Sequence, residues 1–472
     1  MRLELDSMGK KEVPDAAYYG IQTIRALENF PVSGRRERPE LVRAYAMVKF
    51  AAARTNAKLG VLDAKRGKAI EGAARKVMKG GYSDQFPIDV FQAGAGTSFN
   101  MNVNEVIANL ALENLGRSKG DYAYLSPNDH VNCSQSTNDT YSTASQIATA
   151  WMLGVLSERL IDLERTMMVR SGDFRSVMKS GRTHLMDAMP VTLGMEFHAY
   201  GSAIAESRRR LSQRYDDLMP VPLGGTAVGT GVSAHPDFAA LAIKELAKIS
   251  KLPLREMSDK SMGLQSRSPL LAVSGALREL AVELSRIAND LRLMASGPST
   301  GLGEIAMPEV QPGSSIMPGK SNPVMAECLN MICYEIIGND LAVMMAAQAG
   351  QLELNVMTPL ITYKLLDSIS LLNNYLPIFE EKCIRGLIAN EEHCSKLLEK
   401  NSILITNIAP RIGYLKAAEI AKKSMESGRS ISELVVGSKL MSQGDAKRLL
   451  DPKRMLGPNR ASSKSMKARM KG

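Results

Sequence analysis

The stretch that says most about the fold of this chain is Gly313-Ser314-Ser315-Ile316-Met317-Pro318-Gly319-Lys320-Ser321-Asn322-Pro323. The stretch contains two glycines, which adopt backbone conformations that other residues avoid, together with hydroxyl, ammonium and amide groups. Asn322 and Pro323 are residue types favoured at an N-cap and at the first helical position, and apolar residues recur with helical spacing from Val324 to Met345. Helix starts favour anions, so the stretch predicts a flexible catalytic loop that suits a carboxylate.

Three other polar segments are each expected to precede a helix. Any one of them is adequately explained as an ordinary N-cap. Together with the loop, they could supply N–H groups and hydroxyls that bind two carboxylates. The segments are Gly94-Ala95-Gly96-Thr97-Ser98-Phe99-Asn100-Met101-Asn102 before a helix over Asn104–Leu115, Ser134-Gln135-Ser136-Thr137-Asn138-Asp139 before a long run through Met168, and Gly181-Arg182-Thr183-His184 before a helix opened by Pro190.

In order and composition these segments resemble the fumarase/aspartase superfamily, whose loop signature runs GSSxMPxKxNP. Ser321 stands where a valine is usual, and further likeness at residues 13–20, 223–231 and 353–356 extends the resemblance over nearly the whole chain. The resemblance implies a mainly α, three-domain fold with a long central helical bundle, and self-association to a homotetramer with a twenty-helix core. The expected domains are 1–137 (mixed), 138–391 (five-helix bundle) and 392–456 (small helical), followed by a basic disordered tail, 457–472.

Helical periodicity independently predicts a bundle of five long helices. Shorter helices are expected at Pro39–Leu59 and Ala64–Met78 before the bundle, and at Ala417–Ser427 and Ile431–Met441 after it. The five long runs are Thr140–Met168, Val191–Asp217, Ser268–Ser296, Val324–Gln348 and Pro359–Arg385.

Composition is that of a globular protein, with 44% hydrophobic and 23% charged residues. The amino terminus has no apolar signal core, and no apolar run of about 18 residues is evident, so a cytoplasmic location without a membrane partner is expected. The 5 cysteines and 5 histidines show no metal-binding spacing, which predicts neither a metal site nor a cofactor.

Half of the net charge of +10 lies at one end of the chain, because residues 457–472 carry five basic residues and no acid. A solvated basic tail explains this charge, and an arm that binds a polyanion such as nucleic acid is the less favoured interpretation. The five basic residues are Arg460, Lys464, Lys467, Arg469 and Lys471.

The resemblance implies elimination from a succinyl-type substrate to give fumarate, through an aci-carboxylate intermediate and with Ser314 as the base. Each active site would take segments from three chains. By position, Thr97, Ser136, Thr137 and Ser315 match the group that binds the carboxylate beside the abstracted proton, while Thr183, Lys320 and Asn322 match the group that holds the other carboxylate. Asn138 and His184 match the contacts to the leaving group, and Glu327 matches a partner of that histidine.

Within the superfamily, Gly94–Ser98, Ser136-Thr137 and Gln351–Met357 most resemble the aspartate ammonia-lyase branch, which predicts release of ammonia from L-aspartate. His184, Gly319 and Ala227-Val228 also suit fumarase. Hydration of fumarate to L-malate, or a lyase acting on a modified amino-succinate, therefore stays open. A non-catalytic protein on the same fold is disfavoured because Ser314, Lys320 and Asn322 are all intact.

Overall fold

The computed structural model describes residues 1–457, so the predicted basic tail lies almost wholly outside the described residues. Helices dominate this part of the chain, and its strands form four two-stranded sheets. The expectation of a mainly α fold is thereby confirmed.

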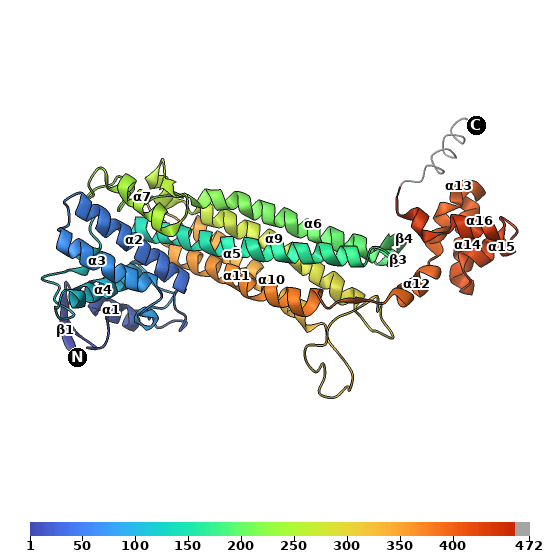
Figure 1. Ribbon diagram of the computed structural model, residues 1–472, viewed down its shortest axis with the longest axis horizontal. Coiled ribbons are helices and arrows are strands. Elements are labelled where there is room, and N and C mark those ends of the chain that lie inside the picture. The colour runs from blue at the N-terminus through green and yellow to red at the C-terminus, as the bar shows by residue number, and fades with distance from the viewer. Residues whose placement is uncertain (458–472) are drawn as a thin grey trace. The chain divides into compact units, whose positions relative to one another are not determined.

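Five long helices carry the fold (Figure 1). All five predicted runs are helical, and three of the helices end a few residues from their expected limits. The run predicted to reach Arg385 ends as an α-helix at Phe379 and continues as a π-helical turn over Glu380–Ile384. The helices are α5 (Thr137–Asp173), α6 (Leu193–Tyr215), α9 (Ser268–Met294), α10 (Val324–Gln348) and α11 (Thr358–Phe379).

The chain divides into two compact units, and each long helix contributes residues to both. Unit 1 contains Met1–Arg159, Ser207–Val282 and Met331–Asn374. Buried hydrogen bonds join its bundle helices. Ser145 Oγ on α5 lies 2.8 Å from Thr362 Oγ1 on α11, and Ser274 on α9 donates to Asp340 on α10 at 2.7 Å.

Unit 1 also holds the amino-terminal helices. Tyr45 on α2 packs edge-to-face against Phe99 on α4 and Tyr141 on α5, with ring centroids 5.5 and 5.7 Å apart. These buried aromatic contacts fix the starts of α4 and α5 beside α2. The remaining elements are β1 (Arg2–Asp6), β2 (Gly9–Val13), α1 (Ile21–Asn29), α2 (Pro39–Lys58), α3 (Ala64–Met78), α4 (Thr97–Asn114), β5 (Pro220–Val221), α7 (Phe238–Ser250), β6 (Arg255–Glu256) and α8 (Lys260–Gln265).

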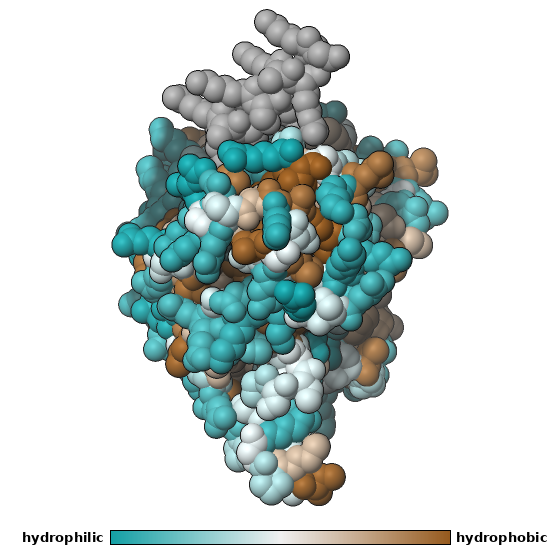
Figure 2. All heavy atoms as spheres, turned by 90° about the vertical axis from the view of Figure 1, so that its right-hand side faces the viewer, coloured by the Kyte–Doolittle hydropathy of each residue, from teal (hydrophilic) through white to brown (hydrophobic). Residues whose placement is uncertain are grey.

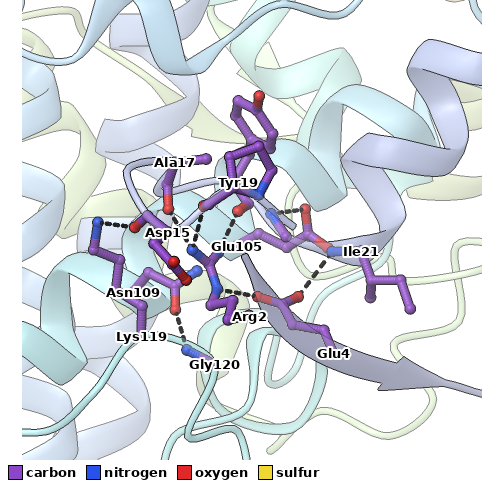
Figure 3. A network of polar contacts seen from close by, with 12 residues as sticks. Arg2, Glu4, Asp15, Ala17, Tyr19, Ile21, Glu105, Asn109, Lys119 and Gly120 are labelled. Carbon is purple, nitrogen blue, oxygen red and sulfur yellow. Dashed lines mark hydrogen bonds and ion pairs between the residues drawn. The ribbon is translucent and has the colours of Figure 1, made fainter. Parts of the chain in front are cut away.

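The segment before α1 is held by buried carboxylates (Figure 3). Glu105 on α4 accepts hydrogen bonds from the N–H groups of Gly20 and Gln22, both at 2.8 Å, and from Thr23 Oγ1 at 2.7 Å. Glu4 accepts from the N–H of Ile21 at 2.8 Å. The carboxylates satisfy the free N–H groups at the start of α1, where helix ends favour negative charge.

Unit 2 contains Leu160–Glu206, Glu283–Asn330 and the chain from Tyr375 onward. Here Asn330 on α10 donates to Ser285 Oγ on α9 at 2.9 Å, and Thr166 on α5 donates to Glu380 at 2.7 Å. The strands are β3 (Met178–Thr183), β4 (Met186–Thr192), β7 (Ile305–Ala306) and β8 (Ile388–Ala389).

The carboxyl-terminal helices of unit 2 pack around their own apolar cluster, which includes Ile408, Ile420 and Val435. Hydrophilic side chains cover most of the face that Figure 2 shows. Both short helices predicted here are present, and the second ends at Gly437 instead of Met441. These helices are α12 (Glu391–Glu399), α13 (Ala409–Ile412), α14 (Tyr414–Ser427), α15 (Ile431–Gly437) and α16 (Gln443–Leu449).

Helix α10 has an exposed apolar face, formed in unit 1 by Met331, Tyr334, Leu341, Met344 and Met345. By length and composition alone α10 could cross a membrane, with a mean hydropathy of 1.2, which the sequence analysis did not expect. One such helix is weak evidence for a membrane span, because the core helix of a water-soluble assembly passes the same test.

Candidate active site

The residues predicted to act on substrate fall into two sets, one in each unit. Unit 1 holds the starts of α4 and α5, which a hydrogen-bond network joins. Unit 2 holds the β3–β4 hairpin and the loop of residues 313–322 before α10, and no hydrogen bond or ion pair joins the hairpin to this loop within the described residues. The first set is Thr97, Ser136, Thr137 and Asn138; the second is Thr183, His184, Ser314, Ser315, Lys320, Asn322 and Glu327.

Three consecutive residues with positive φ, Gly94, Ala95 and Gly96, turn the chain into α4. A Cβ atom on Gly96 would lie 2.2 Å from the ring of Tyr141, so only glycine fits. Thr97 is the first helical residue, is exposed, and its Oγ1 donates to the carbonyl of Gly94 at 2.6 Å.

Helix α4 begins at Thr97, so the prediction that it begins at Asn104 was wrong. Asparagine has low intrinsic helix propensity because its side chain competes for backbone hydrogen bonds. Here the buried asparagines of α4 find tertiary partners instead: Asn100 donates to Thr137 Oγ1 at 3.0 Å, and Asn102 to the carbonyl of Gln85 at 2.9 Å.

The start of α5 confirms the cap expected there. Ser136 N–H donates to Asp139 at 3.0 Å, and Ser136 Oγ accepts from the N–H of Asn138 at 3.2 Å. The other oxygen of Asp139 accepts N–H groups of the glycine-rich segment, from Gly224 at 3.0 Å and Thr226 at 2.9 Å. Burial raises the pKa of this carboxyl to about 7. Asp139 thus joins the segment predicted to bind substrate to the glycine-rich segment.

Sequence reasoning missed Lys49, which lies in α2 with no exposed surface. Its Nζ donates to Oδ1 of Asn100 at 2.8 Å and of Asn132 at 2.9 Å. The available signal was a lone lysine within the apolar run Ala46–Ala53. A lysine there is costly to bury unless its hydrogen bonds are satisfied.

Thr183 and His184 do not precede a helix, so that prediction was wrong. Thr183 ends β3, and His184 and Leu185 form the two-residue turn to β4, with φ of 53° and 60°. Such turns normally use asparagine and glycine, so a histidine at positive φ is strained. Pro190 lies within β4 opposite Ser180, next to a register shift, and α6 begins only at Leu193. Proline is tolerated in a strand at such irregularities.

A buried ion network supports the hairpin. Glu304 has no exposed surface and pairs with Lys179 and with Arg182, both at 2.7 Å. Lys179 also pairs with Glu196 at 2.8 Å. Because Arg182 directly precedes Thr183, the network fixes the base of the turn that exposes Thr183 and His184.

The loop before α10 is closed at its base. Asn322 Nδ2 donates to the carbonyl of Gly313 at 2.6 Å, so this side chain ties the loop and does not cap the helix as predicted. A Cβ on Gly313 would lie 1.8 Å from the carbonyl oxygen of Lys320, whereas Gly319 has a φ of 79° and open space around it. The two glycines are therefore required for different reasons, close approach at Gly313 and backbone conformation at Gly319.

The loop lies between α9 and α10 in Figure 1. Within it, Ser314 accepts two hydrogen bonds from backbone N–H groups. Its Oγ accepts from the N–H of Ile316 at 3.3 Å and of Met317 at 3.1 Å. Ser314 and Lys320 line the same hollow of about 450 Å³. The two N–H dipoles favour negative charge on this oxygen.

The remaining predicted residues lie near the loop in sequence. Ser315 is exposed, and Glu327 is exposed in the first turn of α10, where its N–H donates to the carbonyl of Pro323. Over residues 1–457 no group of three histidine, cysteine or acidic side chains is arranged to hold a metal ion, and all 5 cysteines are free thiols.

Comparison with known proteins identifies the family. Residues 9–338 match the family described as lyase, and residues 404–457 match the fumarase C C-terminus. The chain is 45% identical to an aspartate ammonia-lyase from a Bacillus species over 98% of this chain and 99% of the relative, and 47% identical to one from Pseudomonas aeruginosa over 97% of each. A class II fumarate hydratase from Thermosynechococcus vestitus is 44% identical over 92% of this chain and 93% of the relative.

Among solved structures, a fumarate lyase:delta crystallin from Brucella melitensis bound to cobalt superposes with a TM-score of 0.94. It is 46% identical and the match covers 97% of this chain and 100% of the other. The full-length matches in sequence and fold agree with the four polar segments described above. The chain belongs to the lyase family of fumarases and aspartate ammonia-lyases, and it is a carbon–nitrogen lyase.

Proposed function

We propose that this protein eliminates ammonia from L-aspartate to give fumarate. The observation that carries the proposal is the environment of Ser314 Oγ, which accepts hydrogen bonds from two backbone N–H groups and lines the same hollow as Lys320. A serine acts as a base only as its alkoxide, and an ordinary serine hydroxyl is too weakly acidic to form the alkoxide at neutral pH. The reaction therefore requires an environment that favours negative charge on this oxygen. The aspartate ammonia-lyases that share 45% and 47% identity with the chain support the choice of substrate.

The reaction begins at the carbon next to the carboxylate that is distal to the amine. Ser314, as the alkoxide, takes a proton from this carbon, and the electron pair moves into the carboxylate to give an aci-carboxylate with one additional negative charge. The pair then returns to form the carbon–carbon double bond while the carbon–nitrogen bond breaks. The protonated amine leaves as neutral ammonia, so no further proton is needed.

Hydrogen-bond donors at the helix starts suit the carboxylate on which charge accumulates. We assign this carboxylate to Thr97, Ser136, Thr137 and Ser315, since hydroxyls and helix N-termini stabilise anions without a direct cation. The other carboxylate is assigned to Thr183, Lys320 and Asn322. Asn138 and His184 are assigned to the amine, with Glu327 as the partner of His184.

The assembly that we propose is a homotetramer, in which copies of the chain cover the apolar face of α10. Met331, Tyr334, Leu341 and Met345 recur at helical spacing on this face, and each is more than half exposed. An apolar face of this kind normally marks an interface. The two sets of predicted residues would then be completed by segments from three chains, and an isolated monomer would be inactive. A water-soluble tetramer in the cytoplasm also accounts for the hydropathy of α10.

The direct test is the ultraviolet absorbance of fumarate when purified protein is offered L-aspartate and then L-malate. Formation of fumarate and ammonia from L-aspartate, reversal with fumarate and ammonium, and weak action on L-malate are expected. The matched control is Ser314→Ala from the same preparation, which excludes activity from a contaminating enzyme. Absence of ammonia release from L-aspartate would reject the proposal.

Fumarase activity is the second candidate, favoured by the class II fumarate hydratase at 44% identity and by His184. Hydroxide is a poorer leaving group than ammonia and needs a delivered proton, which an imidazole can supply. Efficient interconversion of L-malate and fumarate, without ammonia release from L-aspartate, would establish this alternative.

A further inference from the structure

The ammonium of Lys49 lies between the starts of α4 and α5 and has no role in the mechanism above. Its hydrogen-bond acceptors are the side chains of Asn100, in the first turn of α4, and Asn132, which precedes α5. Lys49 is fully buried, so its charge acts on both helix starts from inside the protein. In such an interior, charge interactions are much stronger than in water.

Asn100 links this charge to a substrate-binding hydroxyl. Its Nδ2 donates to Thr137 Oγ1 at 3.0 Å. A threonine hydroxyl has one hydrogen, and an oxygen that already accepts one hydrogen bond directs that hydrogen elsewhere. Within residues 1–457, Thr137 Oγ1 donates to no protein acceptor, so its hydrogen is available to a bound carboxylate.

Asp139 acts on the charge of Lys49 without an ion pair between the two side chains. Burial lowers the pKa of Lys49 to about 7, while the negative charge of Asp139 opposes this shift. Asp139 is itself occupied by the N–H groups of Ser136, Gly224 and Thr226. The ring of Tyr45 lies 5.7 Å from Nζ. No carboxylate in the described part of the chain is within ion-pair distance of Lys49.

We propose that Lys49 is a positioning residue: through Asn100 it holds the Thr137 hydroxyl as a donor, and it stabilises the negative charge that develops on the carboxylate bound there. The inference rests on the proposed function, because it assumes that Thr137 binds this carboxylate. An aci-carboxylate carries one more negative charge than the substrate carboxylate, so a fixed cation favours the intermediate over the ground state. This explains how a site whose surface groups are hydroxyls can stabilise a dianion.

A purely structural role for Lys49 is the alternative, in which it only satisfies Asn100 and Asn132. A double-mutant cycle separates the two roles, because residues that act through one another give non-multiplicative losses. The cycle uses Lys49→Met and Thr137→Val, which preserve side-chain volume, with kcat/KM for L-aspartate as the measured quantity. Each single change should lower kcat/KM about 10- to 100-fold. The kcat/KM of the double variant should be at least about fivefold higher than the value expected if the two single losses multiplied.

The control cycle pairs Lys49→Met with Lys320→Met, whose side chain is assigned to the other carboxylate. Its losses should multiply to within about twofold. Melting temperature and light scattering report whether each variant is folded and assembled. If Lys49→Met does not fold, Asn100→Leu replaces it, since this change keeps the cation but breaks the link to Thr137. Multiplicative losses in both cycles would overturn the inference.

Inactivity of the wild-type protein towards both L-aspartate and L-malate would be a failure of the proposed function and not of the link. The same cycles would then be measured on the dissociation constant of fumarate. Coupling between Lys49 and Thr137 in fumarate binding supports the link, and its absence rejects it.

Discussion

The two regions that carry the candidate active site are built in opposite ways. The starts of α4 and α5 lie over a buried network in which Lys49 and Asp139 together make five hydrogen bonds. The loop of residues 313–322 is largely exposed and is closed by the single amide of Asn322. A dense buried network keeps its donors in place before substrate arrives, whereas an exposed loop can move at low cost. The comparison indicates a rigid platform at the helix starts, to which we assign a carboxylate, and a loop that can change conformation at low cost.

Ser314→Ala is expected to have the largest effect on activity and almost none on stability. Loss of the base should lower kcat on the order of 10⁴-fold, while an exposed loop hydroxyl contributes little to folding. Steady-state kinetics and a melting curve measure the two quantities on one preparation. Retention of a tenth of the activity would remove serine from the role of base.

Lys320→Met should damage binding and chemistry together. An ammonium that pairs with a carboxylate does so in both the ground and transition states, so KM should rise and kcat should fall, with kcat/KM about 100-fold lower. The melting temperature should stay unchanged because the side chain is exposed. A KM equal to that of the wild type would contradict the contact.

Asp139→Asn should show the reverse pattern from Ser314→Ala, with a large loss of stability. The asparagine amide would place its own N–H groups against backbone N–H groups that donate to the Asp139 carboxylate in the wild type. The free energy of unfolding should fall by about 2–4 kcal/mol. Chemical denaturation gives the free energy of unfolding, and Ser136→Ala is a milder control at the same cap. Unchanged stability would mean that the platform is not held by Asp139.

The two glycines of the loop should differ on substitution. Gly313→Ala places a Cβ against the backbone of Lys320 and should force the loop base open, with a loss of activity of about 10- to 100-fold. In Gly319→Ala the new Cβ enters open space, and the only cost is about 1 kcal/mol for an alanine at positive φ. The loss of activity should therefore be smaller than for Gly313→Ala. Equal losses would show that the closed base has no effect on catalysis.

A pH dependence of stability tests the buried side of the comparison. Burial raises the pKa of Glu37 to about 7, and its carboxyl accepts from Tyr141 at 2.7 Å. The folded state therefore holds this proton more tightly than the unfolded state. Its contribution to stability is lost as pH rises between the ordinary value, near 4.5, and about 7.

Glu37→Gln removes this titration. The free energy of unfolding of the wild type relative to Glu37→Gln should fall by up to about 3 kcal/mol between pH 4.5 and pH 8. Urea unfolding at several pH values measures the difference. A difference that does not vary with pH would show that folding does not shift the pKa of Glu37.

Predictions succeeded where the deciding residues are close together in sequence and failed where the partner is distant. Helical periodicity placed all five long helices, and the cap at Ser136 was correct because its partner Asp139 is three residues away. The segment Gly181–His184 shows the limit. Its polar residues look like a helix cap, but pairing with residues 186–192 makes it a hairpin, and a strand partner is a tertiary choice.

The sequence by itself determined the family, the helical class, the loop and the residue types offered to a dicarboxylate, because these follow from local spacing and from ordered motifs. Tertiary structure alone decided that Lys49 supports the start of α5 through Asn100, 51 residues away, and that Asn322 closes its own loop. It also decided that Glu304 holds the hairpin through Arg182, 122 residues away. The physical reason is burial: a buried charge must find partners, and packing of distant segments determines which ones it meets.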